Sequence, residues 1–112
     1  MPLVTTNEML KKAQAGHYAV GAFNVENMEM VMAVIKAAEE MNSPVIMQTT
    51  PSTVKYAGLD YYLAMVRTAA ERASVPVAIH LDHGSSFELA MQALRTGYTS
   101  IMIDGSRGYP AR

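Results

Sequence analysis

Two histidines and an aspartate stand together immediately after an apolar segment. His80-Leu81-Asp82-His83-Gly84 directly follows Val75-Pro76-Val77-Ala78-Ile79, which has the composition of a buried strand. Two imidazoles and a carboxylate add nothing to the packing of an apolar strand, so their presence at its end indicates a role other than packing. In parallel α/β enzymes, metal ligands and proton-transfer groups lie at the carboxyl edge of the sheet. The pattern therefore predicts a functional site at this edge.

Asp82 and His83 are neighbours, and neighbouring side chains of an extended strand point to opposite faces. A turn at Gly84 would relax this constraint. One residue could then ligate a metal at about 2 Å while its neighbour contacts bound substrate. His80 lies two positions before Asp82 and could share its face. It could orient the carboxylate, or it could be only a hydrogen-bonded structural histidine.

Asp104 follows the next apolar run, Ser100-Ile101-Met102-Ile103. Because adjacent strands are about 5 Å apart, Asp104 can lie near the histidine cluster. It could be a second metal ligand or a hydrogen-bonding partner of one. A turn-forming aspartate before Gly105 explains the same pattern equally well.

Composition narrows the classes of protein. The chain has 112 residues, half of them hydrophobic, a net charge of −1 and no cysteine. We expect one globular domain with no disulfide or thiolate metal site, and no nucleic-acid or membrane partner. The start, Met1-Pro2-Leu3-Val4, lacks the pattern of a signal peptide, so we expect a cytoplasmic protein.

Other chemistries fit less well. A Schiff-base lysine should project from a strand, but the lysines fall on predicted helices or loops. A pairing of His83 with Ser85 or Ser86 is better explained by helix capping, and the glycines form no dinucleotide-binding fingerprint.

Apolar runs alternate with helical patterns along the chain. We predict buried strands over 19–23, 45–47, 75–79 and 100–103, helices over 5–15, 27–41, 59–73 and 85–96, and a loop over 51–58. Capping boxes are predicted at Thr5 and Ser85, an N-cap at Asn27, and helix stops at Gly16 and Gly97. This order predicts an α/β fold with four parallel strands and a leading N-terminal helix.

Polar residues follow every predicted strand. Asn24, Gln48 with Thr50, the histidine cluster, and Asp104 with Ser106 all fall on the carboxyl side. Such convergence is typical of an active-site edge. Taken singly, Asn24, Gln48 and Ser106 are better explained as turn or capping residues.

These motifs resemble the class II, metal-dependent ketose-bisphosphate aldolases. The resemblance rests on segments 80–88 and 100–106, and also on Met1-Pro2-Leu3-Val4, segment 18–24 and Ser43-Pro44-Val45-Ile46. It implies that residues 1–106 form the first, amino-terminal half of a (β/α)8 TIM barrel. The implied activity is reversible, zinc-dependent cleavage of fructose 1,6-bisphosphate to dihydroxyacetone phosphate and glyceraldehyde 3-phosphate.

The resemblance also implies residue roles. His83 would ligate the catalytic zinc, Asp104 would bind a second, alternative metal position, and Asp82 would be the acid/base at the C4 hydroxyl. Thr50 would contact the triose-phosphate part of the substrate, where the family more often has serine. We predict that Asn24 also binds substrate and that His80 supports the site.

The chain also departs from the family pattern. A full barrel has eight strands and typically about 250 residues. The remaining zinc histidines and most of the phosphate-binding backbone would lie beyond Arg112, and residues 107–112 diverge from the family. We therefore expect a truncated form, inactive by itself, of an enzyme that is homo-oligomeric at full length.

Two alternatives remain. Thr50-Pro51-Ser52-Thr53 also resembles the loop of tagatose-1,6-bisphosphate aldolases. A hypothesis of another class is a non-catalytic half-barrel that self-associates through its open sheet edges.

Overall fold

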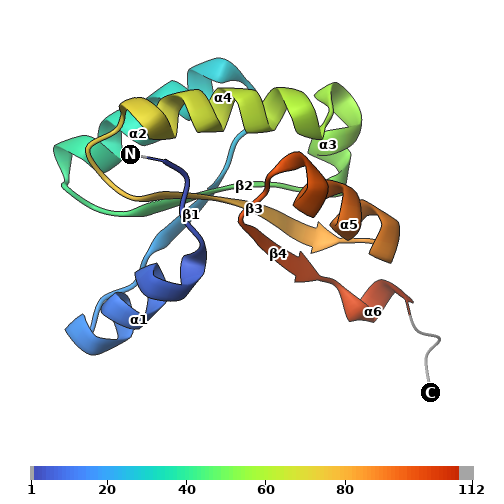
Figure 1. Ribbon diagram of the computed structural model, residues 1–112, viewed down its shortest axis with the longest axis horizontal. Coiled ribbons are helices and arrows are strands. Elements are labelled where there is room, and N and C mark those ends of the chain that lie inside the picture. Colours follow the sequence, from blue (N-terminus) through green and yellow to red (C-terminus); the bar gives the residue numbers. More distant parts are fainter. Residues whose placement is uncertain (1, 109–112) are drawn as a thin grey trace.

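The computed structural model describes residues 2–108. Helices and strands alternate along the chain (Figure 1): α1 (Thr6–Gly16), β1 (Gly21–Asn24), α2 (Met28–Glu40), β2 (Val45–Thr49), α3 (Pro51–Ala57), α4 (Leu59–Arg72), β3 (Val77–Gly84), α5 (Phe87–Thr96), β4 (Ser100–Ile103) and α6 (Gly105–Gly108). The strands form one parallel sheet in the order β1-β2-β3-β4. This confirms the predicted four parallel strands with a leading helix.

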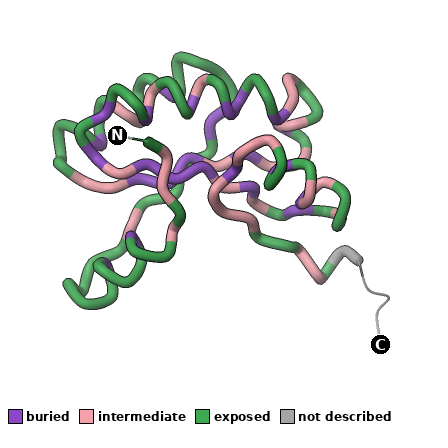
Figure 2. The backbone as a smooth tube through the Cα atoms, viewed as in Figure 1, coloured by how far each residue is buried: buried purple, intermediate pink, exposed green. Residues whose placement is uncertain are grey.

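The two faces of the sheet are covered unequally. Strand residues such as Met47, Ile79 and Leu81 pack against apolar side chains of α2, α4 and α5 in the main core. On the opposite face, Met9 of α1 packs against Ile46 and Ala78. Figure 2 shows buried segments concentrated along the central strands and the helix sides that face them. Each fully buried large aliphatic side chain contributes roughly 1.5–3 kcal/mol by leaving water.

The outer strands differ from the prediction. All four residues of β1 are exposed, and Phe23 retains 51% of its surface. On β4, Met102 and Ile103 are exposed as well. Among the described residues, β1 pairs only with β2 and β4 only with β3, so each outer strand has one free edge. The prediction of a buried strand at β1 is wrong, because strand side chains are buried by elements packed on the faces of the sheet and those of β1 stay exposed in the described part of the chain.

The helix ends confirm some predicted caps and correct others. The side chain of Asn27 caps α2 by accepting a hydrogen bond from the Met30 N–H (2.8 Å), and Gly97 ends α5. Thr5 occupies the N-cap position of α1 without a side-chain bond, so the capping box there is wrong. The cap of α5 is Ser86, which accepts from the Leu89 N–H, and not Ser85.

Other differences concern element bounds. The segment predicted as a loop over 51–58 contains α3, with Pro51 in its first turn, where the missing proline N–H costs nothing. β3 extends through the histidine cluster to Gly84. Gly16 lies inside α1, and His17 takes the left-handed conformation that ends it.

One buried hydrogen bond joins the end of β2 to the segment before β4. The Thr49 hydroxyl lies 2.8 Å from the Tyr98 hydroxyl, and the two side chains are almost wholly buried. Burial raises the pKa of the Tyr98 phenol to about 12. This bond anchors the strand end that carries Gln48 and Thr50. No helix within residues 2–108 combines the length and hydropathy that crossing a membrane requires.

Candidate active site

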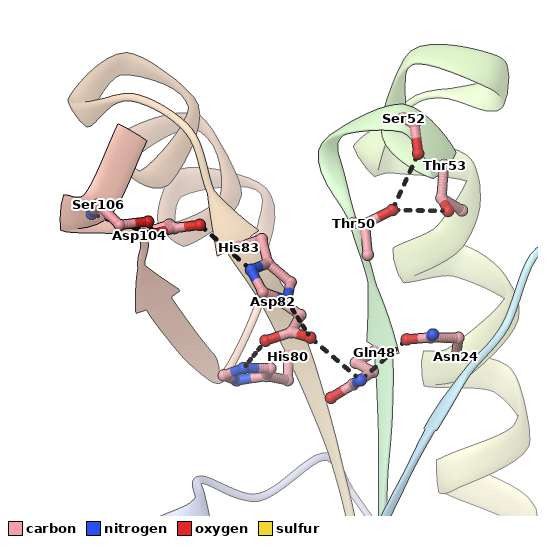
Figure 3. Close-up of polar contacts among 10 residues, drawn as sticks. All are labelled: Asn24, Gln48, Thr50, Ser52, Thr53, His80, Asp82, His83, Asp104 and Ser106. Carbon is pink, nitrogen blue, oxygen red and sulfur yellow. Dashed lines mark hydrogen bonds and ion pairs between the residues drawn. The ribbon is translucent and has the colours of Figure 1, made fainter. Parts of the chain in front are cut away.

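A row of polar side chains crosses the sheet near its carboxyl edge. The strand register places four of them side by side on the face opposite the main core: Asn24, Gln48, His80 and Ser100. The Gln48 amide donates to Asn24 Oδ1 (2.8 Å; Figure 3). His80 Nδ1 lies 2.6 Å from Ser100 Oγ. Parallel strands in register thus bring together residues that are far apart in sequence.

Asp82 follows His80 by two residues along β3, and its side chain lies at the centre of the cluster (Figure 3). Its Oδ1 lies 3.6 Å from His80 Nε2, and its Oδ2 lies 3.5 Å from His83 Nε2. Gln48 Nε2 also donates to Oδ2 (3.3 Å). The side chain is 21% exposed, so the carboxylate is held in place and still reaches solvent. Such a group is placed to exchange a proton with a bound ligand.

An irregularity at the end of β3 lets His83 share a site with its neighbour Asp82. The register against β4 shifts between Leu81 and Gly84, which marks a bulge. The turning residue is His83, whose backbone is left-handed (φ 53°), and not Gly84 as predicted. Gly84 has another function, because a Cβ there would lie 2.9 Å from the Met102 carbonyl oxygen.

Asp104 joins the cluster through His83. Its Oδ2 lies 3.2 Å from His83 Nδ1, and its Oδ1 accepts hydrogen bonds from the backbone N–H and the hydroxyl of Ser106. The Ser106 hydroxyl, followed by His83, holds the pKa of this carboxyl below its usual range. The two ring nitrogens of His83 therefore each face a carboxylate.

Burial lowers the pKa of the His80 imidazole, and the nearby Asp82 carboxylate only partly opposes this effect. His80 is thus biased toward its neutral form, in which one ring nitrogen donates and the other accepts. A neutral ring held between Ser100 and Asp82 orients the carboxylate without neutralising it. The role of His80 as a supporting residue of the site stays a prediction.

Thr50 lies beyond this cluster, at the end of β2 (Figure 3). Its hydroxyl is 3.1 Å from both the Ser52 and the Thr53 hydroxyls. The Thr53 hydroxyl in turn donates to Glu26 Oε1 (3.4 Å). Contacts made directly or through Gln48 link five of the predicted site residues: Asn24, His80, Asp82, His83 and Asp104. Thr50 belongs to a separate cluster of hydroxyl side chains, with Ser52 and Thr53.

Sequence reasoning missed three participants. The sequence pattern favours a turn or capping role for Gln48, whereas in the structure its side chain bridges Asn24 and Asp82. Its position at the end of a strand was the available signal. Ser100 and Glu26 carried no comparable signal, because their contacts depend on strand register and on the path of the chain into α2.

The donor types suit zinc, which accepts imidazole nitrogen and carboxylate oxygen. However, no group of three or more His, Cys, Asp or Glu side chains within residues 2–108 is arranged to hold a metal ion. A catalytic zinc site needs three protein ligands. The described residues could therefore supply part of the ligand set of such a site, but not all three protein ligands.

Comparisons with known proteins agree with this architecture. The sequence model described as class-II fructose-bisphosphate aldolase matches residues 4–110. A fructose-bisphosphate aldolase of Thermus caldophilus is 54% identical over 104 residues, and one of Helicobacter pylori is 49% identical over 105. These alignments cover 93% of this chain and 34% of each relative, so the chain spans about a third of their length.

The fold comparison confirms the predicted portion of an aldolase barrel. The crystal structure of the YdjI aldolase from Escherichia coli K12 superimposes with a TM-score of 0.86 at 39% identity. That alignment covers 93% of this chain and 40% of the other. The strand order, the polar row at the carboxyl edge and these matches are all consistent with part of an aldolase barrel. The chain belongs to the class II fructose-bisphosphate aldolase family.

Proposed function

We propose that this chain contributes the Asp82–His83 corner to the active site of a zinc-dependent aldolase. The reaction is the reversible cleavage of fructose 1,6-bisphosphate to dihydroxyacetone phosphate and glyceraldehyde 3-phosphate. The observation that carries the proposal is the Asp82 carboxylate, held by two histidines and Gln48 at the carboxyl edge of the sheet.

Asp82 is the proposed acid/base. In cleavage it takes the proton of the C4 hydroxyl while the C3–C4 bond breaks, and in condensation it returns that proton to the aldehyde oxygen. Its exposed fraction of 21% supports contact with a ligand. His80 and Gln48 fix its orientation, which is the condition for efficient proton transfer.

His83 is the proposed ligand of the catalytic zinc, and Asp104 the ligand of a second, alternative divalent position. Zinc, when bound, acts as a Lewis acid on the substrate carbonyl. The further ligands would come from residues outside this chain. Asn24 and Thr50 are proposed to bind the phosphorylated ketose, with tagatose 1,6-bisphosphate as the alternative substrate.

The setting of the protein is also a proposal. We expect a cytoplasmic enzyme, homo-oligomeric at full length, in which residues 1–106 belong to the barrel and 107–112 form a divergent tail. The free edges of β1 and β4 favour a second candidate, a non-catalytic half-barrel that self-associates. Light scattering tests this candidate, because a cooperatively melting monomer would contradict required association.

A chimera tests the proposed function. Residues 4–106 of this chain would replace the matching segment of the Thermus caldophilus relative, which supplies the rest of the barrel. We expect zinc-dependent cleavage by the chimera and a loss of about 10²–10⁴ in kcat for Asp82→Asn, the range for a removed acid/base. His17→Asn is the matched control, because exposed His17 ends α1 and Asn tolerates its left-handed backbone.

Two results would contradict the proposal: a folded chimera without activity, or full activity in the Asp82→Asn variant. The isolated chain is expected to show no turnover. Substantial turnover abolished by a chelator would show that further ligands come from a second copy.

A further inference from the structure

Ser100 belongs to the polar row but has no part in the proposed mechanism. It is the first residue of β4, and the parallel register sets it directly beside His80 of β3. Its hydroxyl oxygen lies 2.6 Å from His80 Nδ1, close enough for a short hydrogen bond. The other ring nitrogen, Nε2, lies 3.6 Å from Asp82 Oδ1 (Figure 3). The imidazole thus lies between a hydroxyl and the carboxylate that is proposed as the acid/base.

The two partners of the His80 ring decide which nitrogen carries the proton. A neutral imidazole has one N–H donor and one acceptor nitrogen, and a carboxylate only accepts. Burial favours the neutral ring, since it lowers the pKa of His80. A lone pair on Nε2 would be repelled by the Asp82 carboxylate, whereas an N–H there is attracted to it. The proton therefore belongs on Nε2, and Nδ1 accepts from the Ser100 hydroxyl.

The Ser100 hydroxyl also distinguishes two orientations of the His80 ring. Rotating an imidazole by half a turn exchanges each nitrogen with a carbon atom. In the rotated ring a carbon atom would face the hydroxyl, and Nε2 would turn away from Asp82. The hydrogen bond at Nδ1 would be lost. A bond of this kind shifts an equilibrium between two orientations by up to about tenfold.

Gln48 holds the same carboxylate from the other side. Its amide donates to Asp82 Oδ2 (3.3 Å), while the His80 N–H faces Oδ1. A carboxylate with a donor at each oxygen cannot rotate freely, so its remaining lone pairs keep a fixed direction. That direction determines whether Asp82 can reach the proton of a bound ligand. The orientation of the His80 ring therefore affects the proposed chemistry.

We infer that Ser100 is a positioning residue: its hydroxyl donates to His80 Nδ1 and so selects the ring orientation and the tautomer that present Nε2–H to Asp82. The inference rests on the proposed function for the role of Asp82 as acid/base. Ser100 needs no contact with the substrate for this role, because it acts only through the imidazole.

The first test needs neither substrate nor metal. Nitrogen-15 resonances of the His80 ring are recorded by NMR on the whole chain at about pH 8, above the ordinary histidine pKa near 6.5. We expect the proton on Nε2 and a bare, hydrogen-bonded Nδ1. In Ser100→Ala the Nδ1 resonance should move to that of a nitrogen without a donor. In Ser100→Thr, which keeps the hydroxyl and suits a strand, it should stay near the wild-type position.

Two spectra would overturn the inference. One is a wild-type spectrum with the proton on Nδ1, which would make the Ser100 hydroxyl the acceptor. The other is the same Nδ1 resonance in the wild type and in Ser100→Ala, which would show that the hydroxyl does not hold the ring. Amide resonances outside the site check that each variant is folded.

The second test measures cleavage by the chimera that carries residues 4–106. We expect a kcat about three- to tenfold lower in Ser100→Ala, with little change in KM, because a hydrogen bond of this size is lost. Ser100→Thr should restore kcat. The matched control is Ser43→Ala, because Ser43 is a half-buried serine whose hydroxyl donates to the Met41 carbonyl oxygen before β2 begins. This control should keep the kcat of the unmodified chimera.

A double variant tests whether Ser100 acts through His80. His80→Phe keeps a ring but has no nitrogen, so adding Ser100→Ala to it should cause no further loss of kcat. Additive losses, or an unchanged kcat in Ser100→Ala alone, would overturn the inference. An inactive unmodified chimera counts against the proposed function alone, because the nitrogen resonances of the whole chain still decide which way the hydrogen bond of Ser100 runs.

Discussion

Replacing Tyr98 with Phe removes one hydroxyl from the core and leaves the Thr49 hydroxyl buried without its partner. An unsatisfied buried polar group costs about 1–3 kcal/mol. We expect a loss of that size in the free energy of unfolding, measured by urea denaturation near neutral pH. The double variant Thr49→Val with Tyr98→Phe should be closer to the wild type than the sum of the single variants, because neither polar group remains.

The same bond predicts a dependence on alkaline pH. Burial raises the pKa of Tyr98 from its ordinary value of 10.0 to about 12 in the folded state. The unfolded chain therefore loses this proton first as the pH rises. The contribution of the protonated Tyr98 phenol to the free energy of unfolding is fully present below pH 10 and is lost between pH 10 and 12. At about 1.4 kcal/mol for each pH unit, the loss reaches roughly 2–3 kcal/mol. Tyr98→Phe should remove this part of the alkaline slope.

A change of less than about 0.5 kcal/mol in the unfolding free energy of Tyr98→Phe, together with an additive double variant, would contradict this stabilising contact, since coupling is the signature of a direct contact. An alkaline slope unchanged in Tyr98→Phe would separately refute the assignment of that slope to this phenol.

Three further predictions concern the site. Gly84→Ala should destabilise the fold by about 1–3 kcal/mol in urea, because its Cβ would meet the Met102 carbonyl oxygen at 2.9 Å; unchanged stability would show that β4 moves away freely. Ser106→Ala should raise the pKa of the Asp104 carboxyl toward its usual value in a carbon-detected NMR titration, since the Ser106 hydroxyl is the main group that lowers it; an unchanged titration would contradict this assignment. The His80 imidazole has a lowered folded-state pKa, so its contribution to stability is present above the unfolded pKa near 6.5 and should be lost as the pH falls through the folded value; His80→Asn should flatten this acid slope, and an equal slope in both proteins would refute it.

The alternation of elements was predictable because each carries its own periodicity. Leu59, Leu63, Val66 and Ala70 recur at helical spacing, and all lie buried on one side of α4. β4 begins and ends where the apolar run does. Local signals of this kind need no knowledge of the remaining chain.

Features that depend on neighbours were not predictable. The spacing of Met41 matched the apolar face of α2, but the residue follows the helix and is 74% exposed. β1 has the composition of a buried strand, but its side chains are exposed in the described part of the chain, and composition alone does not show what packs on a strand. Choosing between Ser85 and Ser86 as the cap of α5 required the backbone itself, since both carry the same hydroxyl.

The grouping at the site was predictable only in outline. Polar residues at strand ends indicated a common edge. The structure brings four of the predicted residues into contact there and joins Asn24 to them through Gln48. The role of Gln48 follows from the register that sets it opposite His80 and beside Asp82, and register is not written in a single strand.

At His83, the backbone conformation and the side chain favour different residues, because the backbone is left-handed while the side chain is an imidazole. A residue with a Cβ pays roughly 1–2 kcal/mol for this conformation, whereas glycine adopts it freely and asparagine at lower cost. The residue that best suits the bulge is therefore not the one that supplies an imidazole between two carboxylates. Selection for stability alone would replace His83 by glycine. If the proposed role of His83 is right, a gene copy no longer selected for that role should lose this imidazole before it loses the fold.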